Sequence, residues 1–208
     1  MLRPLVDSRL SLDTFEGRCF VGLVAFEMKG VRPISWLPQI PTATNFAEIN
    51  LRTYVHVDGN EPGVFFFSLD AASSLVVTAA RLGWGLPYFH CEVPLHQDTG
   101  ASVDWHSVRT RPAKVQFRAR FDLGESLSPP SPGSLEFFVA ERYQFYANLR
   151  GALVRARVYH RPYALRRATV SLLETDLLEA AGLPSGGARL PDYFSEGVDV
   201  DVYPIERV

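Results

Sequence analysis

Apolar and polar residues alternate along most of this chain, and a two-residue period is typical of β-strands with one buried face. The alternation is clearest at residues 46–57, where Ile49, Leu51 and Val55 stand between polar side chains. Runs of strand length recur towards the C-terminus, separated by turn-forming residues. The predicted strands span residues 18–28, 46–57, 63–69, 88–95, 101–110, 113–123, 142–148, 151–160, 165–173 and 197–205.

Helical signals are few. Asp70 is a favourable N-cap for a helix predicted at residues 71–82. A second helix is predicted at 175–181 and a helical turn at 135–140. Proline-containing loops are predicted at residues 30–44 and 126–134.

Strands continue on both sides of every loop, so residues 1–208 are predicted to form a single domain. A long open sheet leaves unpaired edges, which natural proteins avoid by curling or closing the sheet. The pattern therefore predicts a mainly β (α+β) fold, with a curled or closed sheet and two or so short helices.

The composition narrows the class of protein. Hydrophobic residues make up 47% of the 208 residues, and the net charge of −2 is unlike that of a nucleic-acid-binding protein. No apolar run reaches the length of a membrane span, and the N-terminus has no signal-peptide core. The two cysteines, Cys19 and Cys91, have no CxxC spacing, which favours reduced thiols. We expect a cytoplasmic protein that binds neither nucleic acid nor membranes.

The strand FAEINLRTYV carries the most informative polar residues. Alternation places Glu48, Asn50, Arg52 and Tyr54 on one face. Such a face can be solvated, but the following strand, GVFFFSL, is apolar on both sides, which indicates a sheet covered on both faces. An acid, an amide, an arginine and a phenol also form a hydrogen-bonding array for a small polar ligand.

Segments along the whole chain resemble the uncharacterised YqjF-like family of the acetoacetate-decarboxylase-like superfamily. They are, in order, LSLDTFEGRCFVGLVAFEMKGVRP, FAEINLRTYV, GVFFFSLDAASSLVVTAARLGWGLPYF, LEFFVAERYQFYA and VYHRPYALRRA. The resemblance implies that the sheet forms a curled or closed antiparallel β-barrel, cone-shaped and with an internal cavity, and it implies a tendency to form homo-oligomers. Family members usually begin with an extra strand and short helix, so the resemblance also implies that this domain lacks the usual N-terminal strand.

The decarboxylase of this superfamily uses a Schiff-base lysine beside a second lysine. Its Gly-x-Pro motif resembles Gly85-Leu86-Pro87 here, but the lysine pair is replaced by Tyr88 and Phe89, neither of which forms an imine. Glu48 resembles the acid of the decarboxylase. The chain has only two lysines, Lys29 and Lys114, and neither is expected to act as the nucleophile. The resemblance therefore argues against Schiff-base decarboxylation.

Other residues add to the candidate site. Arg142 and His160 lie in motifs that resemble the family, and both are predicted to line the ligand site. For Arg142 we expect a buried ion pair with Glu48 or Asp70. The histidines form no HxH or HExxH pair, so no metal and no cofactor is expected.

Three hypotheses follow. The first is a protein that binds a small anionic or carbonyl-bearing molecule, with Glu48 and Tyr88 as the chemically active pair and Asn50, Arg52, Arg142 and His160 as ligand-binding residues. The second is a lyase, hydratase or isomerase without a covalent intermediate that uses Glu48 and Tyr88 as acid and base. The third is an oligomeric scaffold whose polar residues form only an internal network.

Overall fold

A computed structural model describes residues 2–29 and 45–208, so the loop predicted at 30–44 lies outside the described residues. The strands are β1 (Ser11–Leu12), β2 (Val21–Met28), β3 (Phe46–Val57), β4 (Asn60–Ala71), β5 (Tyr88–Asp98), β6 (Ser102–Arg109), β7 (Val115–Ser126), β8 (Gln144–Leu149), β9 (Ala152–His160), β10 (Leu165–Thr175), β11 (Asp192–Ser195), β12 (Val200–Val202) and β13 (Glu206–Arg207). The helices are η1 (Arg3–Leu5), α2 (Ser74–Trp84), α3 (Leu135–Ala140) and α4 (Leu177–Ala180). None of these helices has the length and hydropathy needed to cross a bilayer.

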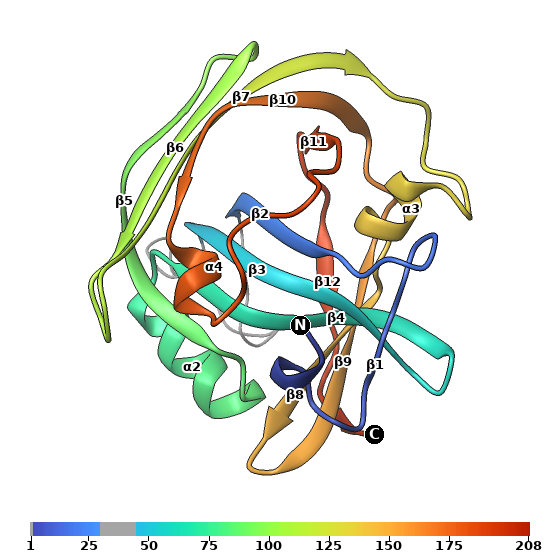
Figure 1. Cartoon of the computed structure of the whole chain (residues 1–208). Helices are drawn as coiled ribbons and strands as arrows, with labels where there is room; N and C mark the ends of the chain where they lie inside the picture. The colour runs from blue at the N-terminus through green and yellow to red at the C-terminus, as the bar shows by residue number, and fades with distance from the viewer. Residues whose placement is uncertain (1, 30–44) are drawn as a thin grey trace.

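The mainly β fold is confirmed, and the strands form one large curled sheet. The order along it is β11-β10-β7-β6-β5-β4-β8-β9-β12, with β3 paired to β4 and β2 paired to β3. In Figure 1, β5, β6, β7 and β10 arch over β2 and β3. Of the two predicted forms, curled or closed, the sheet has the curled one and is not closed. Most of its pairings are antiparallel, and the pairings of β4 with β5 and with β8 are parallel.

Strand β4 is the branch point of the sheet. One edge of β4 pairs antiparallel with β3 over most of its length. The other edge is shared by two parallel partners: β8 pairs with Val64 and Phe65, and β5 pairs with Leu69–Ala71. Because β5 and β8 diverge from there, the two halves of the curled sheet fold away from each other at β4.

Both faces of β3 are consequently buried. On one face, Ile49 and Leu51 pack against Trp105 of β6 and Phe117 of β7. Ile49 and Leu51 are 1% and 0% exposed, and burying each contributes about 2 kcal/mol. On the other face, Tyr54 packs with residues of β4, β8 and β9. The solvated-face interpretation of the Glu48 strand is therefore wrong.

Helix α2 begins later than predicted. Its N-cap is Ser73, whose side chain accepts a hydrogen bond from the Val76 amide, and Asp70 belongs to β4. The helix ends at Gly85, which has φ +66° and lies so close to Asn148 that a Cβ there would stand 2.5 Å from its carbonyl oxygen. This close approach explains the glycine. It also directs the chain into β5, which begins at Tyr88.

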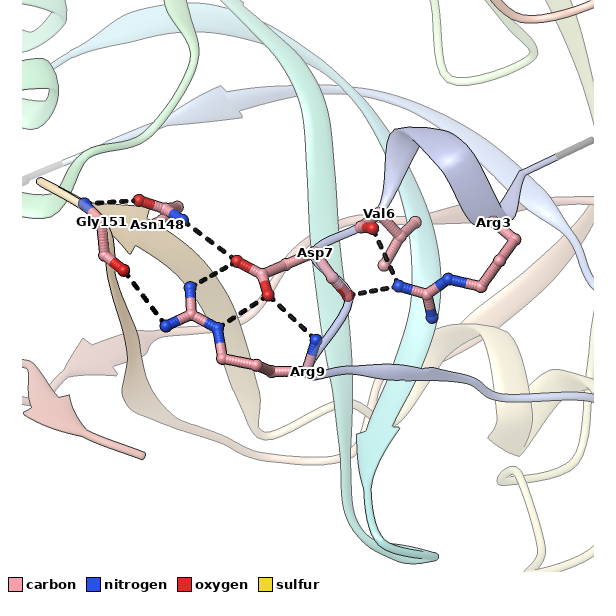
Figure 2. A network of polar contacts seen from close by, with 6 residues as sticks. All are labelled: Arg3, Val6, Asp7, Arg9, Asn148 and Gly151. Carbon is pink, nitrogen blue, oxygen red and sulfur yellow. Dashed lines mark hydrogen bonds and ion pairs between the residues drawn. The ribbon is translucent and has the colours of Figure 1, made fainter.

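The N-terminal segment is held on the β8–β9 turn by a polar network (Figure 2). Asp7 accepts hydrogen bonds from Nε and Nη2 of Arg9 at 2.9 and 2.6 Å, and from Nδ2 of Asn148 at 3.0 Å. Arg9 also donates to the carbonyl oxygen of Gly151 at 3.1 Å. The bonds from Arg9 are the main reason that the pKa of Asp7 lies well below its usual value. The network secures Val6 and Leu10, which pack against β3, β8 and β9.

We predict that Asp7→Asn lowers the melting temperature at pH 7 by about 3 °C, because it removes the charge that Arg9 and Asn148 share. Since the pKa of Asp7 is depressed in the folded state, this stabilisation is full above its unfolded value of 3.8 and declines as the pH falls further. Thermal unfolding followed by circular dichroism at pH 7 and pH 3 measures both effects. Glu16→Gln, in an exposed ion pair with Arg18, is the matched control, and equal melting temperatures for the two variants would contradict the prediction.

Candidate functional site

The structure brings Glu48 and Tyr88 together, as the sequence predicted. In the sheet, Asn50 lies opposite Leu69, and Leu69 lies opposite Tyr88. Glu48 lies opposite Ala71, which is the next residue pair of the β3–β4 ladder on the same face of the sheet. Side chains of these rows share one face, and the hydroxyl of Tyr88 donates a hydrogen bond to Oε2 of Glu48 at 3.0 Å.

Glu48 is a buried acid that retains its proton at neutral pH. Its residue is 3% exposed, and its pKa is raised from 4.5 to about 8. Burial is the main cause, the hydrogen bond from Tyr88 lowers the pKa, and the charge of Asp70 raises it. The pKa of Tyr88 lies well above 10, chiefly through burial and also through the charge of Glu48. At pH 7 the pair is thus a neutral carboxylic acid beside a neutral phenol.

Asn50 and Arg52 leave two buried polar atoms without partners among the described residues. Asn50 is 5% exposed, and its Oδ1 atom accepts no hydrogen bond. Arg52 donates from Nη2 to the carbonyl oxygen of Val139 at 3.0 Å, while its Nε atom is buried and unpaired. An unpaired buried donor or acceptor costs about 1–3 kcal/mol. The free acceptor, Oδ1 of Asn50, and the free donor, Nε of Arg52, lie two residues apart on the Glu48 face. They would suit a bound molecule that has one hydrogen-bond donor and one acceptor.

The predicted ion pair of Arg142 with Glu48 or Asp70 is wrong, and the guanidinium of Arg142 lies instead 5.2 Å from the centre of the Tyr54 ring, at the far end of the Glu48 face of β3. It binds Asp13, with Nη1 at 2.7 Å from Oδ2, and donates from Nε to the carbonyl oxygen of Phe138 at 2.8 Å. Its guanidinium also lies 4.3 Å from the centre of the Phe138 ring. Contacts with the end of helix α3 and with Asp13 of the N-terminal segment therefore hold Arg142 in place. Asp70 lies on the face of β4 that is opposite the Glu48 face.

His160 lies in a separate aromatic group. It is 4% exposed, with Tyr143 stacked at 4.6 Å and Tyr163 at 4.7 Å between ring centres. Its Nδ1 atom is 2.8 Å from the carbonyl oxygen of Arg161. None of these contacts involves Glu48, so a ligand-binding role for His160 stays a prediction without support from its position.

No lysine or cysteine of the described residues supplies a nucleophile beside Glu48. Lys29 is exposed and pairs with Glu27 at 3.1 Å, and Lys114 is exposed. Cys91 is a free, buried thiol whose pKa is raised to about 12, mainly by burial. Residues 2–29 and 45–208, which the structure describes, contain no group of three or more His, Cys, Asp or Glu side chains that could hold a metal ion.

Arg109 is a candidate residue of this region that was not predicted from the sequence. This residue is buried and binds Asp70 through two hydrogen bonds of 2.7 Å. A signal was present, because Arg109 falls in the same alternation phase as Val103, Trp105 and Ser107, which are all buried. An arginine in the apolar phase of a strand indicates a buried acidic partner.

Comparisons with known proteins place the chain in a family. The model of the DUF2071 family, described as an uncharacterized conserved protein, matches residues 1–199. The chain is 32% identical to the uncharacterized protein YqjF of Bacillus subtilis (strain 168) over 209 residues, covering all of this chain and 84% of YqjF.

Solved structures agree on the fold. The enduracididine biosynthesis enzyme MppR in complex with pyruvate matches with a TM-score of 0.56 and 12% identity, covering 96% of this chain and 77% of MppR. An acetoacetate-decarboxylase-like enzyme from Sphingomonas wittichii RW1 matches with a TM-score of 0.56 and 14% identity, covering 100% of this chain and 85% of that enzyme. At these identities the likeness concerns the fold alone.

We predict that Glu48→Gln stabilises the protein increasingly as the pH rises from 4.5 to about 8. A raised folded-state pKa means that wild type loses stability across this window, because only the unfolded chain releases the proton. Glutamine carries no titrating group, so at pH 8.5 its melting temperature should exceed that of wild type by about 5 °C. Melting temperatures from pH 4.5 to 9 measure the effect. The exposed acid Glu125 provides the control Glu125→Gln, and a wild-type-like pH profile for Glu48→Gln would refute an elevated pKa.

Proposed function

Because the chain belongs to the DUF2071 family and has the fold of acetoacetate-decarboxylase-like enzymes, we propose that it binds a small anionic or carbonyl-bearing molecule, without Schiff-base chemistry. The observation that carries the proposal is a pair of buried atoms that have no partner among the described residues, Oδ1 of Asn50 and Nε of Arg52, on the strand face that also carries the neutral acid Glu48. Native proteins rarely leave such atoms unpaired unless water or a ligand completes them.

The donors and acceptors describe the ligand. Oε2 of Glu48 receives the Tyr88 hydroxyl, which leaves Oε1 to carry the proton and donate it to a ligand oxygen. Asn50 accepts from a ligand hydroxyl, enol or water, and Arg52 attracts a carboxylate or enolate oxygen. A short 2-oxo or 3-oxo acid supplies these groups. MppR, which shares the fold, is known in complex with pyruvate, and this supports 2-oxo acids as the first compounds to test.

A second function is favoured by the hydrogen bond between Tyr88 and Glu48. A neutral carboxylic acid with a pKa of about 8 both donates and accepts a proton near neutral pH, which suits a lyase, hydratase or isomerase without a covalent intermediate. In that case Glu48 protonates the ligand carbonyl or enolate, and Tyr88 holds the acid in position.

Binding is tested by thermal shift and calorimetry with pyruvate, acetoacetate and 2-oxobutyrate. A ligand at about 100 times its Kd adds about 2.7 kcal/mol, which raises the melting temperature by several degrees in a chain of this size. For an anionic ligand, affinity should fall as the pH rises through 8, because Glu48 then becomes negatively charged. Borohydride with pyruvate should add no mass, whereas an adduct on Lys29 or Lys114 would overturn the exclusion of Schiff-base chemistry.

Asn50→Val distinguishes a ligand site from an internal network. Valine is apolar, is closer to asparagine in volume than leucine is, and removes the unpaired acceptor, so the ligand-free variant should melt about 2–4 °C higher than wild type. If Asn50 binds ligand, the same variant loses the ligand-induced shift, while the exposed control Lys114→Gln keeps it. If no compound stabilises wild type, the scaffold hypothesis gains and the proposal fails.

A further inference from the structure

A buried ion pair lies on the face of β4 opposite the Glu48 site. Arg109 donates from Nε to Oδ2 and from Nη2 to Oδ1 of Asp70, each at 2.7 Å. The two side chains are 5% and 4% exposed. Burying two charges costs free energy that a buried ion pair often fails to recover relative to apolar residues of the same size. A pair of this kind therefore calls for a role besides stability.

The ion pair crosses one strand. Arg109 ends β6, Asp70 stands in β4, and β5 runs between them. The guanidinium lies 3.9 Å from the centre of the Phe89 ring, and Phe89 is opposite Asp70 in the short β4–β5 ladder. Since Phe89 follows Tyr88, the ion pair fastens the start of β5 to β4 directly behind the tyrosine that contacts Glu48.

Asp70 also lies next to Glu48 in the sheet. It is opposite Ile49, while Glu48 is opposite the adjacent residue, Ala71. The charge of Asp70 adds to burial in raising the pKa of Glu48. The residues opposite Glu48 on β2 and β4, Phe26 and Ala71, do not titrate. The titratable or charged groups around this part of the sheet are Arg52 on β3, Asp70 on β4, Tyr88, His90 and Cys91 on β5, Arg109 on β6 and Arg81 on α2.

We propose that the Asp70–Arg109 ion pair is a positioning element of the Glu48 site, which holds Tyr88 against Glu48 and keeps that acid in its neutral form. The charge of Asp70 disfavours a negative charge on Glu48. Burial raises the pKa of Asp70, and the hydrogen bonds and charge of Arg109 oppose that rise and favour the ionised form of Asp70. The inference rests on the proposed function only in taking Glu48 as the acid of the site.

The test is the titration of Glu48 in protein without ligand, followed by the carbon-13 signals of the side-chain carboxyls and assigned with Glu48→Gln. The double variant Asp70→Asn/Arg109→Gln removes both charges and leaves two uncharged polar side chains in their place. We expect its Glu48 midpoint to fall by about one pH unit. Asp7→Asn is the control, because it removes a distant ion pair and should leave the midpoint unchanged. A folded double variant whose Glu48 titrates as in wild type would overturn the proposal.

Wild type gives a second readout that needs no variant of the ion pair. If the two acids are coupled, the Asp70 carboxyl signal shows an inflection at the Glu48 midpoint, and the signal of Asp7 does not. A flat Asp70 signal there would overturn the proposal even if the double variant failed to fold. Neither measurement contains ligand, so failure of ligand binding and failure of this inference are observed separately.

Discussion

Strand β4 pairs with two diverging strands along one edge, and this fork determines which side chains of the neighbouring strand β3 are buried. An ordinary antiparallel sheet with one solvated face would leave Glu48, Asn50 and Arg52 in water. Here β5 and β8 lead into two different parts of the sheet. Residues of β6 and β7 cover one face of β3, and residues of β8 and β9 cover the other. Polar residues on β3 therefore need partners within the protein or from a ligand.

The effect of this burial is visible in two acids of the same chain. Asp7 lies near the surface, shares its charge with Arg9 and Asn148, and has a depressed pKa. Glu48 is enclosed, accepts a hydrogen bond from the phenol of Tyr88, and has a pKa of about 8. The same functional group is thus a charged, ion-paired carboxylate in one place and a neutral acid in the other. The difference arises from solvation and partners, and not from residue type.

Much of the fold was predictable, because alternation reports which residues of a strand share a face. It does not report which strand lies opposite, and that is where the predictions failed. Asp70 and Ser73 are both good N-cap residues, and Ser73 is the N-cap of helix α2. The side chain of Asp70 is bound instead by Arg109, which is 39 positions away in the sequence. Arg142 was assigned to Glu48 or Asp70, although Asp13 of the N-terminal segment is its partner. The Glu48–Tyr88 contact was found because a family resemblance supplied the long-range pairing that local pattern lacks.

The resemblance to the decarboxylases implies that Tyr88 and Phe89 stand where those enzymes have a lysine pair, and such a replacement changes the surroundings of the buried acid. Beside an ammonium group, a carboxylate is stabilised in its charged form, and the two groups neutralise each other. Beside a phenol, and with the charge of Asp70 on the opposite face adding to burial, the acid keeps its proton. The guanidinium of Arg109 lies over the Phe89 ring and is paired with Asp70. Under the proposed function, the face of β3 that a ligand meets therefore offers Arg52 and neutral hydrogen-bonding groups, while the Asp70–Arg109 charges lie on the other face.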